Sequence, residues 1–207
     1  MGAHDRSALH GVEGVDVARR RRAAALAGFE GDEEAAVGFL ADEDPGVRAT
    51  ALGALVRIGR LPSGTVARAL SDPSAVVRRR AAELAGSLAG ADYLPLLSDE
   101  DPGVVEAACF AVGEVGDSRA LAELCRIAEG HEDPLCRESA VAALGAIGDV
   151  AGLPSVLAAL NDRPAVRRRA VIALAPFEGP EVEQALERAL GDRDWQVRQA
   201  AEDQLRP

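Results

Sequence analysis

The sequence has few aromatic residues, few histidines and no long apolar run. Aromatic residues make up 3% of its 207 residues, and histidine occurs three times. Because no stretch of about 18 apolar residues occurs, no membrane-spanning helix is predicted. Residues 1–17 contain several charged side chains and no apolar run of signal-peptide length. We therefore expect a cytoplasmic protein.

Cysteine is scarce too, with Cys109, Cys125 and Cys136 as its only positions. An odd count without Cys-x-x-Cys spacing argues against a disulfide framework and against a zinc site. We expect these three side chains to act as small buried hydrophobes in a reducing compartment.

No catalytic motif is found. The sequence lacks Gly-x-Ser-x-Gly, a glycine-rich phosphate loop and any cluster with metal-ligand spacing. Adjacent carboxylates such as Glu33 and Glu34 lie at expected helix starts, where the helix dipole accounts for them. We therefore predict that the protein has no catalytic, cofactor-binding or metal-binding residues and uses no cofactor.

The charge is predominantly acidic. The 34 acidic residues outnumber the 23 basic ones, which gives a formal net charge of −11. Such a charge repels nucleic acid and anionic membranes at long range. The hydrophobic share of 48% is ample for burial, and alanine, leucine and valine supply most of it.

The sequence contains a repeated motif, called the phrase below, that occurs six times. The phrase is first seen over residues 40–55, with Val47 taken as its marker, and "place n" denotes the nth residue after a marker. The other markers follow at steps of 27 to 32 residues: Val77, Val104, Cys136, Val166 and Val197. Place 1 is arginine in five copies of six, and place 4 is alanine in all six. A period of this length is typical of a solenoid.

The positions that recur from copy to copy have a physical explanation. The marker and the place-4 alanine share one helix face, and the small alanine allows a neighbouring helix to approach closely. Five residues before the marker stand Asp42, Asp72, Asp99, His131, Asn161 and Asp192. A carboxylate there can cap the next helix, and the place-1 arginine can reach the acidic turn of a neighbouring repeat. We predict a structural ladder of Asp42, Arg48, Asp72, Arg78, Asp99, Arg137, Arg167, Asp192 and Arg198.

The Asp-x-x-x-x-Val-Arg units that begin at Asp42, Asp72 and Asp192 resemble those of HEAT-repeat proteins. They are similar to the short bacterial HEAT-like repeats of phycobilin lyases. His131 and Asn161 depart from the pattern at the acidic position, and Val105 departs at the arginine. The resemblance runs from about Glu30 to the end of the chain. It implies an all-α solenoid of about six two-helix repeats, in which the Val-Arg helix is the inner one and lines the concave face.

The helical pattern predicts a flexible segment over residues 1–14 and a single HEAT-repeat solenoid domain over 15–207. A first helix is expected from Asp16 to Gly28 and a short one from Glu33 to Leu40. The expected inner helices are Pro45–Ile58, Ala75–Leu88, Pro102–Val115, Pro134–Ile147, Pro164–Ala175 and Asp194–Leu205. The expected outer helices are Ser63–Leu70, Ala91–Leu97, Ser118–Ala128, Val150–Leu160 and Pro180–Leu190. His131 is expected to have a role in a turn or in a helix cap.

The candidate partner-binding surface is the side of each inner helix opposite its buried stripe. At 100° per residue, that side comprises places 2, 5, 6 and 9. The candidates are Arg79, Glu106, Phe110, Glu138, Arg168 and Ile172. Two interpretations stay open: a shallow inert groove covered by neighbouring helices, or a groove for a partner's helix or extended peptide. The run Arg19–Arg22 is either solvated helix surface or a contact for an anion or acidic partner.

These observations favour a non-enzymatic scaffold that binds another protein through its concave face. One alternative is an accessory, lyase-like or chaperone-type subunit that handles a small ligand or cofactor. Nucleic-acid binding is a further alternative, as in HEAT-like alkylpurine DNA glycosylases, but the acidic charge and the lone Trp195 and Tyr93 disfavour it. Deoxyhypusine hydroxylases are also built of HEAT-like repeats, but they need several His-Glu pairs to hold two irons. Only one such pair, His131-Glu132, occurs here, so this activity is not predicted.

Overall fold

The computed structural model describes residues 5–62, 64–84 and 90–206, with side chains from Asp16 onward. It divides into two compact units, Met1–Ala91 and Asp92–Pro207, called unit 1 and unit 2 and described separately below. All regular elements of the described residues are helices, and these residues form no strand. The predicted all-α solenoid of two-helix repeats is confirmed.

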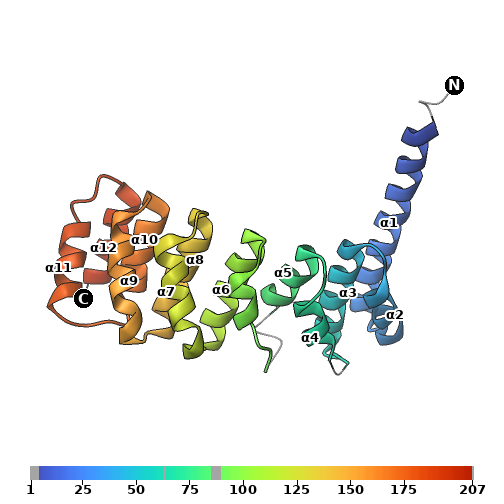
Figure 1. The fold of residues 1–207 in the computed structure, drawn as a ribbon, viewed down its shortest axis with the longest axis horizontal. Helices are drawn as coiled ribbons and strands as arrows, with labels where there is room; N and C mark the ends of the chain where they lie inside the picture. Colours follow the sequence, from blue (N-terminus) through green and yellow to red (C-terminus); the bar gives the residue numbers. More distant parts are fainter. Residues whose placement is uncertain (1–4, 63, 85–89, 207) are drawn as a thin grey trace. The chain divides into compact units, whose positions relative to one another are not determined.

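Unit 1 consists of an inner and an outer layer of helices (Figure 1). The inner layer is α1 (Asp5–Glu30), α3 (Pro45–Ile58) and α5 (Ala75–Glu83), and α3 packs on both of the others. The outer layer is α2 (Glu33–Gly38), the 3-10 turn η1 (Phe39–Ala41) and α4 (Thr65–Leu70).

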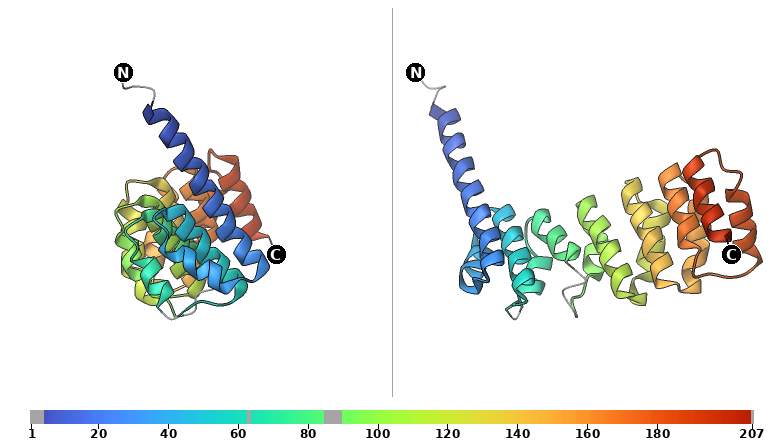
Figure 2. Two further views of the ribbon diagram at one scale, coloured as in Figure 1. Left: turned by 90° about the vertical axis from the view of Figure 1, so that its right-hand side faces the viewer. Right: turned by 180° about the vertical axis from the view of Figure 1, so that it is seen from behind.

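Unit 2 repeats this arrangement (Figure 1, Figure 2). Its inner helices lie side by side in chain order: α6 (Pro102–Val115), α8 (Pro134–Ile147), α10 (Pro164–Ala173) and α12 (Trp195–Leu205). The outer elements are η3 (Leu94–Ser98), η4 (Ser118–Ala120), α7 (Leu121–Gly130), η5 (Val150–Gly152), α9 (Leu153–Ala158), η6 (Ala159–Asn161) and α11 (Pro180–Ala189).

Three inner helices have the predicted bounds because their ends are set by local capping. In α3, α6 and α8 a proline occupies the first turn, where no N–H is needed, and the preceding aspartate accepts hydrogen bonds from the first free N–H groups. The glycine after each helix has a positive φ: 74° at Gly59, 66° at Gly116 and 68° at Gly148. Both signals can be read directly from the sequence.

The outer elements differ from the prediction. The helix expected over Ala91–Leu97 is the 3-10 helix η3, where Pro95 supplies no N–H for an α-helical bond. The helix expected over Val150–Leu160 is divided into η5, α9 and η6. The expected end of an inner helix at Leu88 lies outside the described residues.

The first helix also differs from the prediction, since α1 begins at Asp5, well before the expected start at Asp16. Flexibility of residues 1–14 and a single domain over 15–207 both stay predictions.

The core follows the repeat phrase. Every marker side chain is 3% exposed or less, and the place-4 alanine is fully buried in all six copies. The alanines remove little surface each, but they let the inner helices pack closely against one another.

Candidate functional site on the inner helices

An arginine ladder joins neighbouring repeats. Arg167 donates from Nε and Nη2 to the Asp192 carboxylate at 2.8 and 2.7 Å. Its Nη1 donates to the carbonyl oxygen of Asp162, in its own turn, at 2.8 Å. The same bidentate arrangement, over 2.6 to 3.0 Å, joins Arg48 to Asp72 and Arg137 to Asp162. Each guanidinium thereby fixes two successive turns.

The ladder carboxylates are held ionised. Chiefly because Arg167 donates to its charged form, the pKa of Asp192 lies below the ordinary value for aspartate. The hydrogen bond from Arg137 lowers the pKa of Asp162 in the same way. The Arg167 side chain is 6% exposed and that of Asp192 16%, so solvent screens this pair only weakly.

The capping role predicted for the residue five before the marker is wrong. The N-cap lies three residues before the marker instead, at Asp44, Asp101, Asp133 and Asp194. The earlier aspartate accepts from the N–H two residues on, as Asp192 does from Asp194 at 2.7 Å, and so forms the turn that presents its carboxylate to the ladder.

The two copies that lack an aspartate five residues before the marker use other side chains for the turn and the ladder. His131 keeps the turn with its imidazole, because Nδ1 accepts from the N–H of Asp133 at 3.1 Å. This is the turn role that the sequence predicted. In the next copy the ladder carboxylate belongs to Asp162, one residue after the expected Asn161.

The remaining ladder residues hold their own turns. The Nη1 groups of Arg78 and Arg198 donate to the carbonyl oxygens of Asp72 and Asp192 at 2.9 and 2.7 Å. Asp99 Oδ1 accepts from the N–H of Asp101 at 2.9 Å. Val105, at place 1 of its copy, is buried.

The first inner helix contains a ladder arginine that the sequence analysis missed. Arg20 of α1 donates from Nε and Nη2 to the Asp42 carboxylate at 2.8 and 3.2 Å, as the place-1 arginines do. If Arg19 is taken as a marker, Arg20 falls at place 1 and Gly28 at place 9. The interpretation of Arg19–Arg22 as solvated surface is therefore wrong for Arg20. This additional copy of the phrase was not recognised in the sequence because it has Arg19 where the other copies have a marker valine or cysteine.

Places 2 and 6 of the predicted inner face lie at the surface in unit 2. Phe110 is 56% exposed and Ile172 41%, and Glu106, Glu138 and Arg168 are half-buried. Place 5 was assigned wrongly, because it is buried in five copies: Leu52, Ala82, Cys109, Val141 and Val171. Place 5 faces neighbouring helices, since each inner helix packs on both an outer helix and its inner neighbours. Place 9 varies, because Gly113 is buried and Ala175 is exposed.

Unit 2 has a hollow of about 360 Å³ between α6 and α8. Three candidate residues, Glu106, Phe110 and Glu138, line it together. Leu135, 54% exposed, borders the same space, and alanines of α8 lie in its wall. Arg169 reaches it from α10 and pairs with Glu138 at 3.4 Å. The candidates Arg168 and Ile172 lie on α10 and are not among the lining residues.

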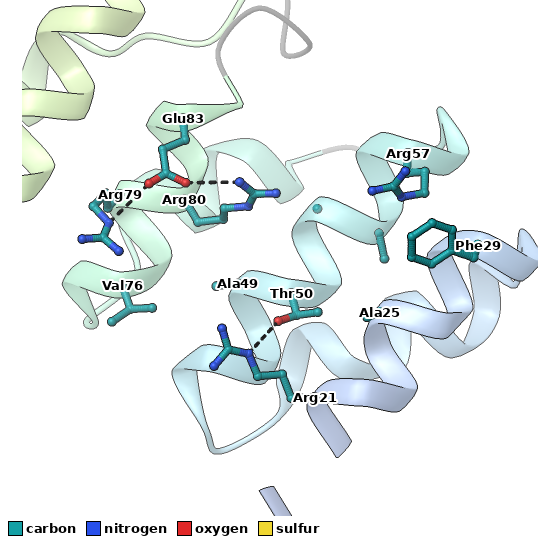
Figure 3. Close-up of a pocket in the computed structure, with 12 residues that line it drawn as sticks. Arg21, Ala25, Phe29, Ala49, Thr50, Arg57, Val76, Arg79, Arg80 and Glu83 are labelled. Atoms are coloured by element: carbon teal, nitrogen blue, oxygen red, sulfur yellow. Dashed lines mark hydrogen bonds and ion pairs between the residues drawn. The ribbon is translucent and has the colours of Figure 1, made fainter. Parts of the chain in front are cut away.

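Unit 1 has a hollow of about 340 Å³ on the equivalent face of α1, α3 and α5 (Figure 3). Four arginines surround it, Arg21, Arg57, Arg79 and Arg80, and Glu83 is the carboxylate among its lining residues. Of these four arginines, Arg79 was predicted as a binding candidate, and Arg21 belongs to the run Arg19–Arg22, for which a contact with an anion or acidic partner stayed open. Arg57 and Arg80 were missed because places 10 and 3 were counted as outside the inner face.

Comparison with known protein families decides the classification. The HEAT-repeat model matches residues 62–127 and 91–165, which together span half of the chain. The chain belongs to the HEAT-repeat family. A second model, the PBS lyase HEAT-like repeat, matches residues 166–192. No curated protein matches the sequence.

Two solved structures share the fold of this HEAT-repeat chain, and a third is similar at a lower TM-score. An engineered protein is 19% identical, with a TM-score of 0.62 over 84% of this chain and 95% of that one. Escherichia coli YibA is 17% identical, with a TM-score of 0.63 over 83% of this chain and 69% of that one. Human deoxyhypusine hydroxylase in complex with glycerol is 24% identical, with a TM-score of 0.49 over 90% of this chain and 77% of that one.

The described part of the HEAT-repeat chain contains no cluster of three or more His, Cys, Asp or Glu side chains that could hold a metal ion. Within the same part, no helix has the length and apolar character that crossing a membrane requires.

Thiol reactivity is expected to follow burial. Burial raises the pKa of the fully buried Cys109 far above its ordinary value, and it raises the pKa of Cys136 to about 11. The Cys136 Sγ–H also donates to the Pro102 carbonyl oxygen at 3.2 Å, whereas Cys125 is half-buried. In the folded protein at pH 8, Ellman's reagent should therefore titrate one thiol, that of Cys125, and all three after denaturation. Fast reaction of Cys125→Ser would contradict this expectation.

Proposed function

We propose that this HEAT-repeat protein is a non-enzymatic scaffold that binds a segment of another protein on its inner helices. The observation that supports the proposal best is the unit 2 hollow, where the large apolar side chains Phe110 and Leu135 are more than half exposed. An exposed apolar strip rimmed by polar residues is typical of a protein-interaction site.

The lining suits a helix or an extended peptide. Alanines of α8 form a low wall, so a partner side chain can lie against both Phe110 and Leu135. Burying one large apolar side chain there would contribute about 1.5–3 kcal/mol. Glu106, Glu114 and Glu138 surround the strip and are opposed by Arg169, which favours a segment with basic residues beside its apolar anchor.

The test is the substitution Phe110→Asp. We expect the variant to lose a partner that wild-type protein recovers from a lysate of the source organism, with affinity reduced at least tenfold, because a charge would replace an apolar anchor. Its melting temperature should change little, because a residue that is 56% exposed contributes little to the core. Quantitative mass spectrometry of the recovered proteins and a titration with the partner measure both effects.

The matched control is Val150→Asp on the outer element η5, where the side chain is 74% exposed. It introduces the same charge away from the inner helices and should retain the partner. Equal loss in both variants, or no partner for the wild type, would oppose the proposal. Co-purification of a small ligand or cofactor would favour the accessory-subunit alternative, and salt-sensitive retardation of DNA would favour nucleic-acid binding.

A further inference from the structure

We propose that the hollow of unit 1, bordered by Arg21, Arg57, Arg79 and Arg80, binds an acidic segment of a partner protein in which carboxylates flank an apolar side chain. The inference rests on the proposed function, because it names a partner chemistry for the inner helices of unit 1.

The arginines of this hollow are poorly neutralised. Arg79 and Arg80 share one carboxylate, that of Glu83, at 3.4 and 3.1 Å. Arg21 donates from Nε to the neutral hydroxyl of Thr50 at 3.3 Å. The Arg57 guanidinium lies 4.3 Å from the centre of the Phe29 ring. Among the residues that the structure describes, Arg21 and Arg57 have no carboxylate within ion-pair distance.

The geometry leaves these groups accessible (Figure 3). The side chains of Arg79 and Arg80 are 54% and 41% exposed, and Arg21 and Arg57 are exposed on α1 and α3. Small residues such as Ala25, Ala49 and Gly53 line the space between the guanidinium groups. A partner's apolar side chain can therefore lie on the small residues while its neighbouring carboxylates reach the rim. Guanidinium forks bind carboxylates in bidentate geometry.

The charge of the chain is divided between the units. Residues 1–91 hold 12 arginines and 12 acidic residues, whereas residues 92–207 hold 11 arginines and 22 acidic residues. The entire net charge of −11 thus belongs to unit 2, and unit 1 combines a neutral total with a basic hollow. An acidic segment meets no net repulsion from unit 1 itself.

A short acidic segment fits better than a nucleic acid. A long polyanion would be repelled by the net charge of −11 of the chain, whereas a short segment needs only the neutral unit 1 with its basic hollow. Single-stranded nucleic acids also require aromatic faces for base stacking. Phe29 is the one aromatic residue that lines this hollow, and Arg57 already covers a face of its ring.

The experiment is selection of peptides from a random 12-residue display library on the full-length protein. The recovered peptides should be enriched in Asp and Glu around a central apolar residue. The variant Arg21→Glu/Arg79→Glu should bind them at least tenfold more weakly, and added salt should weaken their binding to the wild type. Arg21→Gln/Arg79→Gln, which avoids new negative charges, should show the same direction of change if the glutamate variant folds poorly.

Arg68→Glu is the matched control. Arg68 is exposed on the outer helix α4 of the same unit, so the change of charge per site is equal but lies away from the hollow. It should leave peptide binding within twofold of the wild type.

Several outcomes would overturn the inference. Peptides without acidic enrichment, or acidic peptides that bind the arginine variants as well as the wild type, would do so. If the recovered peptides depend on Phe110 and not on Arg79, the inference fails while the proposed function stands. If the library yields no peptide that depends on either residue, both fail. Tighter binding of a 12-nucleotide single strand, or self-association lost in the arginine variants, would assign the hollow to a nucleic acid or to a second copy.

Discussion

Replacing Asp192 with alanine is expected to lower the free energy of unfolding by about 3 kcal/mol. The substitution leaves the Arg167 guanidinium, whose side chain is 6% exposed, without the carboxylate that takes two of its hydrogen bonds. It also removes the acceptor for the N–H of Asp194, which forms the turn before α12. Removing one partner of a shielded ion pair costs more than the pair contributes, because the other charge remains buried.

Denaturant unfolding at pH 7, followed by circular dichroism and by fluorescence of Trp195 in unit 2, measures this loss. The double variant Arg167→Met/Asp192→Leu should lose less than Asp192→Ala, because it removes both charges together. Since the folded-state pKa of Asp192 is lowered, the stabilisation is complete above the ordinary pKa of aspartate and is lost as the pH falls through the folded value. The difference from the wild type should therefore narrow below about pH 4. A loss below 1 kcal/mol at pH 7, or a difference that widens with acid, would contradict the ladder argument.

Local sequence signals predicted the inner helices well. The bounds of α3, α6 and α8 follow from a proline in the first turn and a glycine after the last turn, and both act over a few residues. The outer elements carry weaker signals. Short 3-10 segments such as η3 and η5 arise where proline and packing compete with the α-helical pattern, and residue periodicity does not resolve that competition.

The ladder was predicted in type but not in every member. The Arg48–Asp72 and Arg167–Asp192 pairs follow from the repeat register. Asp162 is displaced by one residue from that register, and Arg20 follows an arginine instead of a marker valine, so neither matched the phrase. The long arginine side chain can still reach a carboxylate that is shifted by one residue along the chain. Such a shift therefore breaks the sequence pattern and leaves the ion pair intact.

The candidate binding face could be located from the sequence only to within part of a helix turn. The prediction that the side of each helix opposite its buried stripe is exposed was correct for Phe110 and Ile172. It was wrong for Leu52 and Val141, because the angle at which neighbouring helices pack decides which flank is covered. The same packing angle explains why Arg57 and Arg80, at places 10 and 3, line the unit 1 hollow.

Replacing Gly145 with alanine is expected to lower the free energy of unfolding by about 2 kcal/mol, although alanine is the better helix former. Gly145 lies in the last turn of α8 at place 9, where a Cβ would stand 2.7 Å from both Cα and Cβ of Ala173 on α10. Much of that obstacle is backbone, since the Ala173 carbonyl oxygen would be 3.0 Å away. The helices must therefore separate, and the overpacking outweighs the gain in helix propensity of about 1 kcal/mol.

The matched control for this prediction is Gly130→Ala at the end of α7, where an added Cβ meets no atom within 4 Å and φ is not positive. That variant should be as stable as the wild type or slightly more stable, because it gains helix propensity without a clash. Thermal and denaturant unfolding of both variants compare the two effects directly. Unchanged or increased stability of Gly145→Ala would show that α8 and α10 can separate at little cost, and close packing through small residues would then not hold the inner helices together.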